Sequence, residues 1–480
     1  MLNRKLMGPD PSVPSDRPGR PPGEIFLFAV TDISLSKFYF EHVLGAAALL
    51  FLPMAILLAK GIAPVFAAAG LAVLVLGLVR NRAVPLDLGP VISSLGALSV
   101  WALFTVLWSI TPAETVKTSL SLTAIFFGGA ILFAAGSHLD GRRKEAFKTA
   151  LIFGGFFGFI LITFELIANA RLSLFHYWDL AGKSFFFTKG GYLLALKPGL
   201  AATALFFWPW ALAVRDRFRV SVTGPAIAVA LGLIVYAANY AVVMALVAGV
   251  CVFILGWCLP RIMPWALAGV VALGLVFAPL VPGLLPNPFE KGPHLRWLNP
   301  SSAQRIIIWN NAVVHIKEKP VLGAGFDATR ALYGKKDRVV YKFPDEIAGR
   351  PWGPTMYEPI PLHPHNAVLQ VWLELGAVGA AIILVLLLAV IRAIDRTIED
   401  RVRRAAALGA LTTWLVVASI SFGIWQSWWL ASIFLTGTFM VIVLVPDGED
   451  QPDIEETGGP KGLEPTRYGD WESKGRAIDF

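Results

Sequence analysis

Long apolar runs recur along the whole chain and constrain its fold more than any other feature of the sequence. Each run holds about twenty residues, the length that an α-helix needs to cross the hydrocarbon core of a bilayer. Only 15% of the residues are charged and 56% are hydrophobic, whereas about a quarter of the residues in a soluble protein are charged. The sequence therefore predicts an all-α polytopic membrane protein with about twelve transmembrane helices. The runs lie near residues 42–60, 61–79, 89–108, 117–136, 149–170, 193–214, 222–240, 241–259, 265–285, 366–391, 405–423 and 427–446.

Lysine and arginine gather in one alternating set of the short loops between these runs. Since the short cytoplasmic loops of membrane proteins are the basic ones, this set is expected to face the cytoplasm. With an even number of spans, both termini are then cytoplasmic. The formal net charge of +8 fits such loops, and the sequence lacks the arginine-rich stripe with interleaved aromatics that would indicate a nucleic-acid partner. The basic set contains Arg80, Arg82, Arg142, Arg143, Lys144, Lys148, Arg215, Arg217, Arg219, Arg261, Arg392, Arg396, Arg401, Arg403 and Arg404.

Composition divides the chain into membrane segments, two tails and one large loop. Residues 1–41 are polar and rich in proline, and a secretory signal would have its apolar core much nearer the start, so we expect a disordered cytoplasmic tail. Residues 42–285 and 366–446 hold the first nine and the last three predicted helices. Residues 447–480 are rich in glycine, proline and charge, which predicts a second disordered cytoplasmic tail.

The loop at residues 286–365 is far longer than any other and lies on the side opposite the basic loops. Loops of this length are usually functional or disordered. This one contains Trp297, Trp309, Phe326 and Trp352, and such aromatic content favours a folded segment. We therefore expect this loop, partly helical and periplasmic, to carry the chemistry.

The first motif of the loop is a helix that presents an arginine. Ser301 or Ser302 can cap it, and Arg305, Trp309 and Ala312 then fall on one face. The guanidinium group is always charged and offers five N–H donors, which suits a phosphate or a diphosphate. An arginine at the lipid headgroup boundary is an equally good interpretation of this feature alone.

The second motif is the run Pro320–Phe326. It lacks the Gly-Lys-Ser/Thr that completes a nucleotide-binding loop, so it does not predict a nucleotide site. Gly323 and Gly325 are better interpreted as residues that permit a tight turn.

The third motif begins with His363-Pro364-His365-Asn366, where the large loop enters a membrane helix. Pro364 and Asn366 are typical of a first helical turn, so the helix N-terminus is expected beside His365. A helix N-terminus offers free N–H groups and a positive dipole end to phosphate oxygens. A histidine titrates near neutrality and can act as a general base, which is the role we predict for His365.

Polar side chains continue this motif into the membrane. Asn366, Gln370 and Glu374 stack one helical turn apart, and a buried acid in a span is a candidate functional residue. They are predicted to bind substrate together with His363, although Gln370 and Glu374 could instead hold helices together. No metal is expected, because His363 and His365 lack a carboxylate at ligand spacing and the loop has no Asp-X-Asp.

These motifs together resemble the O-antigen ligase and O-antigen polymerase family of bacterial envelope polysaccharide enzymes. The predicted layout is similar as well, with a large periplasmic loop before the tenth span. The residues that carry the resemblance are Arg305, Trp309, Ala312, Pro320–Phe326, His365, Asn366, Leu369, Gln370, Glu374, Gly376 and Gly379, with a weaker match at Trp108–Pro112.

The resemblance implies a GT-C-like membrane glycosyltransferase in the bacterial inner membrane. Its donor would be a glycan on undecaprenyl diphosphate, and its acceptor a hydroxyl of lipid A–core or of another glycan. His365 would activate the acceptor hydroxyl, Arg305 would stabilise the leaving diphosphate, and Trp309 would belong to the substrate site. Neither a cofactor nor a metal would be required.

The sequence departs from the family at a second arginine. Members carry it at the outer end of the span before the eighth helix, where this chain reads Ala237-Ala238-Asn239-Tyr240. Lys197 in the sixth predicted span, or Arg296 in the loop, could supply the missing positive charge. The sequence leaves both alternatives open.

The same sequence features allow two functions other than a ligase. A polymerase that joins lipid-linked repeat units of O-antigen or exopolysaccharide fits the same motifs. A transporter is a remote alternative, because transporters show paired interrupted helices and midplane charges, and this chain has no internal repeat.

Overall fold

The computed structural model describes residues 39–79, 89–139, 141–175, 191–237, 240–285, 300–333, 339–341, 355–357, 359–444, 471–473 and 476–478. It divides into two compact units, Met1–Val445 and Pro446–Phe480, which are described separately.

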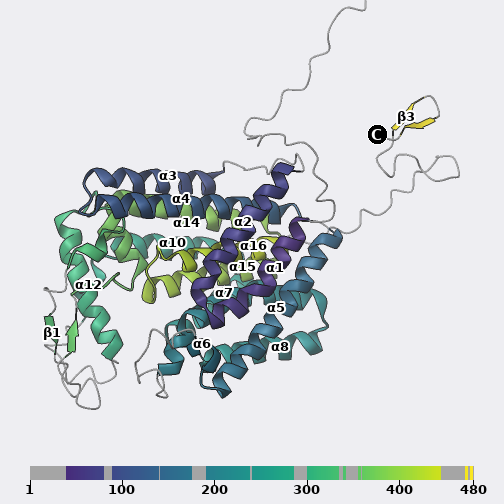
Figure 1. Cartoon of the computed structure of the whole chain (residues 1–480), viewed down its shortest axis with the longest axis horizontal. Helices are drawn as coiled ribbons and strands as arrows, with labels where there is room; N and C mark the ends of the chain where they lie inside the picture. The colour runs from purple at the N-terminus through teal and green to yellow at the C-terminus, as the bar shows by residue number, and fades with distance from the viewer. Residues whose placement is uncertain are drawn as a thin grey trace, which may run out of the picture. The chain divides into compact units, whose positions relative to one another are not determined.

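The larger unit is a bundle of long helices (Figure 1). Twelve of the described helices lie in or near the twelve predicted apolar ranges, which confirms an all-α polytopic membrane protein. Within the described residues nine helices are long and apolar enough to cross a membrane, and α10 is a shorter apolar helix, so the number of spans stays a prediction. The twelve are α1 (Phe40–Leu57), α2 (Ile62–Val79), α3 (Pro90–Phe104), α4 (Pro112–Ser137), α5 (Gly141–Ile167), α7 (Gly191–Arg217), α8 (Val220–Ala237), α9 (Tyr240–Cys258), α10 (Met263–Phe277), α14 (Ala367–Thr397), α15 (Arg401–Ile420) and α16 (Ser427–Leu444).

Shorter elements complete the two units. In the larger unit, β1 pairs antiparallel with β2, with Val340 opposite Met356. In the smaller unit, β3 pairs antiparallel with β4, with Glu472 opposite Ala477. These elements are α6 (Arg171–Phe175), α11 (Val281–Leu284), α12 (Pro300–Glu318), β1 (Val339–Tyr341), β2 (Thr355–Tyr357), β3 (Trp471–Ser473), β4 (Arg476–Ile478) and the 3₁₀ turns Ala59–Gly61, Thr105–Leu107 and Ala328–Ala331.

The core of the bundle forms around α16, where close aromatic packing joins three helices. The ring of Phe51 stacks on that of Phe206 at 5.4 Å, and Phe439 meets both rings edge-on. Small residues let the backbones approach, since a Cβ on Gly154 of α5 would lie 2.6 Å from the carbonyl oxygen of Ala48. The outward faces of α8 and α10 remain apolar, with Val229 and Val270 exposed, as lipid contact requires.

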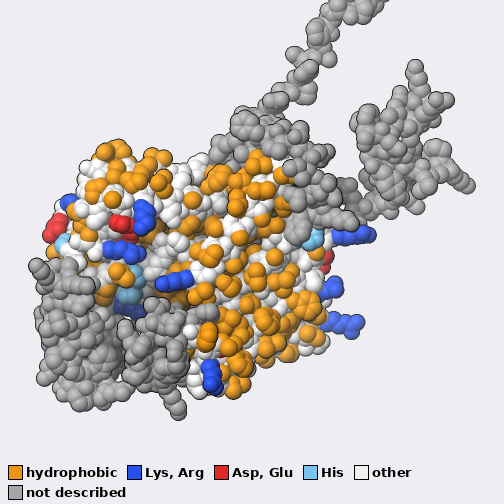
Figure 2. Space-filling model, in the orientation of Figure 1, with side chains coloured by type: hydrophobic (Ala, Val, Ile, Leu, Met, Phe, Trp, Pro, Cys, Tyr) orange, Lys and Arg blue, Asp and Glu red, His pale blue; other side chains and the backbone are white. Residues whose placement is uncertain are grey.

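Charged side chains gather at the two ends of this apolar body (Figure 2). At the end formed by the C-terminus of α7 and the start of α15, Asp216 lies 2.7 Å from Arg403 and 3.7 Å from Lys148. Arg215 and Asp400 form a neighbouring pair at 3.9 Å. These arginines and Lys148 belong to the set predicted to be cytoplasmic, and the ion pairs tie their helices together. The orientation itself stays a prediction.

Helix α14 is interrupted where the Pro320–Phe326 segment inserts into it. Gly376 has φ 65° and ψ −164°, far from helical values. In an unbroken helix the Ala377 N–H would donate to the Leu373 carbonyl. Instead Ala377 donates to the carbonyl of Pro320 at 2.9 Å, and the Ala324 N–H donates to Leu373 at 2.8 Å. The inserted segment therefore satisfies the backbone groups that the break exposes.

Glycine is required on both sides of this break. Gly323 and Gly325 have φ of 71° and 109°, which agrees with the predicted tight turn. A Cβ on Gly323 would overlap the carbonyl of Glu374, and one on Gly376 would overlap that of Val321. This contact places the residues after Phe326 beside the first half of α14, where the candidate site forms.

Candidate active site

His365 occupies the turn that leads into α14 and is held from two directions. Its backbone, at φ 54°, donates from the N–H to Nδ1 of His363 at 3.2 Å. Its ring Nδ1 lies 2.8 Å from the carbonyl oxygen of Ser421, which follows α15. Because a carbonyl oxygen can only accept a hydrogen bond, Nδ1 carries the proton and donates. The neutral ring then keeps its lone pair on Nε2, as a general base needs.

The surroundings of His365 favour its neutral form. Burial lowers its pKa from the ordinary value of 6.5, and the charges of Arg305 and Lys197 lower it further, against a raising contribution from the Ser421 hydrogen bond. The neighbouring His363, whose ring centroid is 4.3 Å away, is also buried, and its pKa falls to about 3. Both imidazoles are therefore uncharged near neutral pH.

Arg305 on α12 and Lys197 on α7 place two positive charges near His365. The Nζ atom of Lys197 lies 5.6 Å from the ring centroid of Phe422, next to the Ser421 that holds His365. Among the residues that the structure describes, no acidic side chain forms an ion pair with either cation. Within the described part of the chain, both charges therefore lack an acidic partner and can bind an anionic ligand.

Lys197 and Arg296 were the two alternatives for the missing arginine. Lys197 lies close enough to Arg305 and His365 for its charge to act on both. Arg296 and Asn239 lie outside the described residues. The structure therefore brings one of the two alternatives to the site.

A hydrogen bond from Trp309 links α12 to the turn at His363–His365, called the histidine turn below. Its indole Nε1 donates to the carbonyl of Pro364 at 3.0 Å. Below it, Ala312 and Ile316 are buried with Leu369 and Leu373 of α14. The shared face predicted for Arg305, Trp309 and Ala312 is therefore the face that packs on α14, and Trp309 contacts the turn that holds His365.

Asn366 caps α14, as its position in the motif indicates. Its side-chain oxygen accepts hydrogen bonds from the N–H groups of Val368 and Leu369, both at 3.0 Å. These are two of the free donors that an uncapped helix would present to a phosphate. Since the cap occupies them, the positive charge at the site comes chiefly from Arg305 and Lys197.

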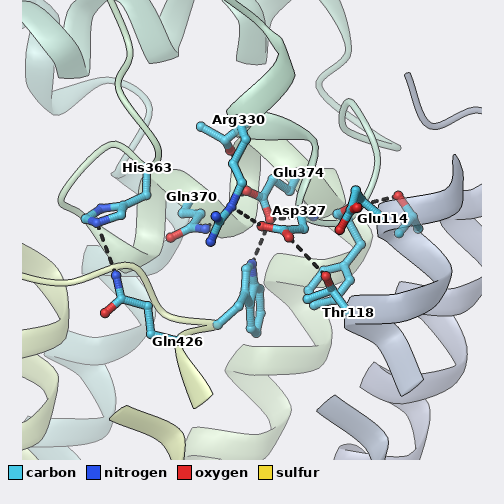
Figure 3. Close-up of polar contacts among 12 residues, drawn as sticks. Glu114, Thr118, Asp327, Arg330, His363, Gln370, Glu374 and Gln426 are labelled. Atoms are coloured by element: carbon cyan, nitrogen blue, oxygen red, sulfur yellow. Dashed lines mark hydrogen bonds and ion pairs between the residues drawn. The ribbon is translucent and has the colours of Figure 1, made fainter. Parts of the chain in front are cut away.

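Glu374 is the hub of a fully buried hydrogen-bond network (Figure 3). Its Oε2 accepts from Trp425 Nε1 at 2.7 Å and from the Asp327 N–H at 3.0 Å. Its Oε1 accepts from the Thr329 hydroxyl and from Gln370 Nε2, the latter at 3.1 Å. With no exposed surface, Glu374 matches the alternative in which the stacked polar residues hold segments together.

Gln370 extends this network to the loop before α16. Its Oε1 accepts the N–H of Ile424 at 3.1 Å, while its amide nitrogen donates to Glu374. Gln370 is 3% exposed, yet it reaches the wall of a cavity of about 230 Å³ that His363 also lines. Gln370 and His363 are thus the predicted substrate-binding residues that border an open space.

Several residues of the site were not predicted from the sequence. Asp327, Thr329 and Trp425 bind Glu374, and Ser421 fixes the tautomer of His365. Ser421 acts through its backbone, so no side-chain pattern could reveal it. Asp327 follows the Gly323–Phe326 turn directly, and this position was the one available signal.

Comparison with known proteins agrees with this geometry. A family model described as O-antigen ligase matches residues 225–384, a range that contains α12, the segment inserted into α14, and His365. This third of the chain is similar to the O-antigen ligase family. A "Putative polysaccharide ligase" of Rickettsia bellii is 27% identical over 349 residues, which cover 72% of this chain and 79% of that protein. A protein of the same description from Rickettsia conorii is 24% identical over 352 residues, covering 73% and 79%.

The C-terminal unit resembles a different group of proteins. Residues 446–480 match a family model described as a protein of unknown function. A "UPF0369 protein" of Rickettsia prowazekii is 69% identical over 36 residues, which cover 8% of this chain and 46% of that protein. The described part of this unit is the β3–β4 pair, although the whole segment was predicted as a disordered tail.

Proposed function

We propose that this protein is a membrane glycosyltransferase of the O-antigen ligase type. It moves a glycan from undecaprenyl diphosphate to a hydroxyl of lipid A–core on the periplasmic face of the bacterial inner membrane, without a metal. The observation that carries the proposal is the pairing of a neutral His365, with Nε2 unprotonated, and two unbalanced cations, Arg305 and Lys197.

The chemical step uses these three side chains. The oxygen of the acceptor hydroxyl attacks the anomeric carbon of the donor glycan, and His365 Nε2 takes the proton of that hydroxyl. The bond between the anomeric carbon and the diphosphate oxygen breaks, and the diphosphate leaves with the electron pair. Arg305 and Lys197 stabilise the negative charge that develops on it. Atoms and charge balance without any further reactant.

The burial of the site supports the same assignment. Electrostatic stabilisation is stronger where water is excluded. Burial is the main cause of the lowered pKa of both His365 and Arg305, which shows that both groups are shielded from water. Burial lowers the pKa of Arg305 below its ordinary value, yet a guanidinium group stays protonated in proteins. Arg305 therefore offers a full charge to the leaving diphosphate.

Both relatives are named as polysaccharide ligases, which favours a ligase over the polymerase alternative. The geometry of His365, Arg305 and Lys197 serves either reaction, because both use the same donor and leaving group. The identity of the acceptor separates them.

A transfer assay tests the proposal. The purified protein is incubated in detergent with an undecaprenyl-diphosphate glycan, EDTA and lipid A–core, and the products are separated by mass. Glycan attached to lipid A–core is the expected result. Longer lipid-linked glycan without transfer to the core would make the protein a polymerase, and the absence of any product with either acceptor would contradict the proposal.

A further inference from the structure

A cavity of about 230 Å³ lies between α4 and His363, next to the candidate catalytic residues. Its wall is formed by α4, by the residues that follow the inserted Pro320–Phe326 segment, by the histidine turn with the first half of α14, and by the loop before α16. Of the described residues, His363 and Gln370 belong to this wall, whereas His365, Arg305 and Lys197 do not. His363 is therefore the member of the histidine pair that borders the cavity, and the two cations lie outside its wall.

The charges that border this cavity are balanced, in contrast to the cation pair. Arg330 Nε lies 3.3 Å from Oδ1 of Asp327, and Lys117 lies 3.6 Å from Glu114. Among the described lining residues, each cation thus has an acidic partner, and no excess positive charge is left to select an anion. A diphosphate is thus favoured at Arg305 and Lys197, and an uncharged ligand is favoured in the cavity.

The remaining lining suits a ligand with many hydroxyl groups. Asp327 Oδ2 accepts from the Thr118 hydroxyl at 3.0 Å, and its carboxylate keeps further lone pairs for ligand hydroxyls. Gln426 offers a side-chain amide, and the aromatic Trp425 lines the same space. Figure 3 shows that these side chains come from different elements, with Thr118 directed to Asp327 and Gln426 directed to His363. Polar side chains thus alternate with the apolar Leu122, Ile125, Leu362 and Trp425 in the wall, a mixture that suits a sugar, which has both hydroxyl groups and apolar ring faces.

We propose that this cavity binds the uncharged sugar of the acceptor, with Asp327 accepting hydrogen bonds from its hydroxyl groups. The inference rests on the proposed function, since it assigns the acceptor to the cavity beside His363 and the donor to the two cations. The acceptor sugar enters on the side of His363, and the donor diphosphate lies on the side of Arg305 and Lys197. Asp327 then determines which acceptor is used.

Blocking the cavity without touching the cations gives the sharpest test. Ser121 is an exposed cavity residue on α4, and Thr123, two positions along, points about 200° away around the helix. Ser121→Trp fills the cavity, and Thr123→Trp is the matched control of equal size. We expect Ser121→Trp to raise the KM for lipid A–core about tenfold or more and to leave the KM for the donor unchanged, as the loss of one specific subsite does.

Asp327→Asn probes the chemistry of the same cavity. The substitution keeps the size of the side chain and removes its charge. We expect Asp327→Asn to bind core oligosaccharide, released from lipid A, about tenfold more weakly than the wild type does. Calorimetry measures this affinity. This binding needs no turnover. If the wild type binds the oligosaccharide, Asp327→Asn weakens that binding and no glycan is transferred, then the proposed function fails while sugar binding in the cavity stands. If transfer proceeds and Ser121→Trp behaves like Thr123→Trp, or if the wild type binds no oligosaccharide, the cavity is not the acceptor site.

Discussion

The ring Nδ1 of His365 lies 2.8 Å from the backbone carbonyl oxygen of Ser421, and this contact decides which nitrogen of the imidazole is free. The donor must be Nδ1, so Nε2 is the basic atom. Ser421 ends α15, more than fifty residues beyond His365 in the sequence. The position of a distant helix end therefore sets the chemistry of the histidine turn.

The activity is expected to depend on pH through His365. Burial and the charges of Arg305 and Lys197 hold its pKa below 6.5, so the ring is the neutral base above that lowered pKa. Activity is present at neutral pH and is lost as the pH falls through the lowered pKa. The pH profile of kcat/KM should thus have an acidic limb with its midpoint below 6.5.

Arg305→Gln tests the cause of this shift. Removing the charge should move the midpoint of the acidic limb to higher pH, in addition to lowering the rate. Lys317→Gln, at an exposed position of the same helix, is the control and should leave the midpoint in place. A midpoint that does not move in Arg305→Gln would show that Arg305 does not act on His365.

Glu374→Gln should weaken the structure without changing the base. A glutamine places an NH₂ group against donors from Trp425, Thr329 or Asp327, so at least one buried donor loses its acceptor. The expected loss is about 1.5–3 kcal/mol in the free energy of unfolding. The midpoint of the pH profile should stay at its wild-type value, which a catalytic role for Glu374 would not allow. Glu318→Gln, with the Glu318 side chain 61% exposed beside His315, is the control and should cost about 0–1 kcal/mol.

Gly376→Ala should destabilise the break in α14. The residue has φ 65° and its Cβ would overlap the carbonyl of Val321, so both strain and a clash are introduced. We expect a loss of about 1–3 kcal/mol or more, measured as a lower unfolding temperature in detergent. Gly274→Ala in α10 meets nothing within 4 Å and should not lower stability. Equal unfolding temperatures for the two variants would mean that α14 tolerates an alanine in the break.

Asp216 is expected to stabilise the end of the bundle opposite the active site. It contacts Arg403 at 2.7 Å and Lys148 at 3.7 Å, and Lys148 is only 3% exposed. Asp216→Asn should lower the free energy of unfolding by about 1–3 kcal/mol. Arg215→Gln breaks a longer pair, 3.9 Å, at a 40% exposed side chain, and should change stability by about 0–1 kcal/mol. A larger effect for Arg215→Gln would contradict this ranking.

Local sequence signals predicted most of the fold. Apolar runs of membrane-spanning length identified the helices, and Asn366 marked the start of α14, where it caps the helix. Gly323 and Gly325 were recognised as turn residues, and both have positive φ. The break at Gly376 was not predicted, because the run at 366–391 looks continuous and only a contact from another segment shows why the helix stops.

Only part of the site could be predicted from the sequence, and the reason is physical. His365 and Arg305 carry residue types that suggest a base and an anion ligand on their own. The pairing of Lys197 with Arg305 depends on how α7 packs, and periodicity contains no information about packing between distant helices. The same holds for Asp327 and Trp425, whose roles exist only because the inserted segment and the loop before α16 meet at Glu374.

The most direct test of the account is the rate of glycan transfer by His365→Ala, with and without added imidazole. A general base contributes about 10²–10⁴-fold, so we predict a loss of that size, partial recovery with imidazole, and unchanged donor binding. Transfer by His365→Ala at the wild-type rate would contradict the assignment of His365 as the base.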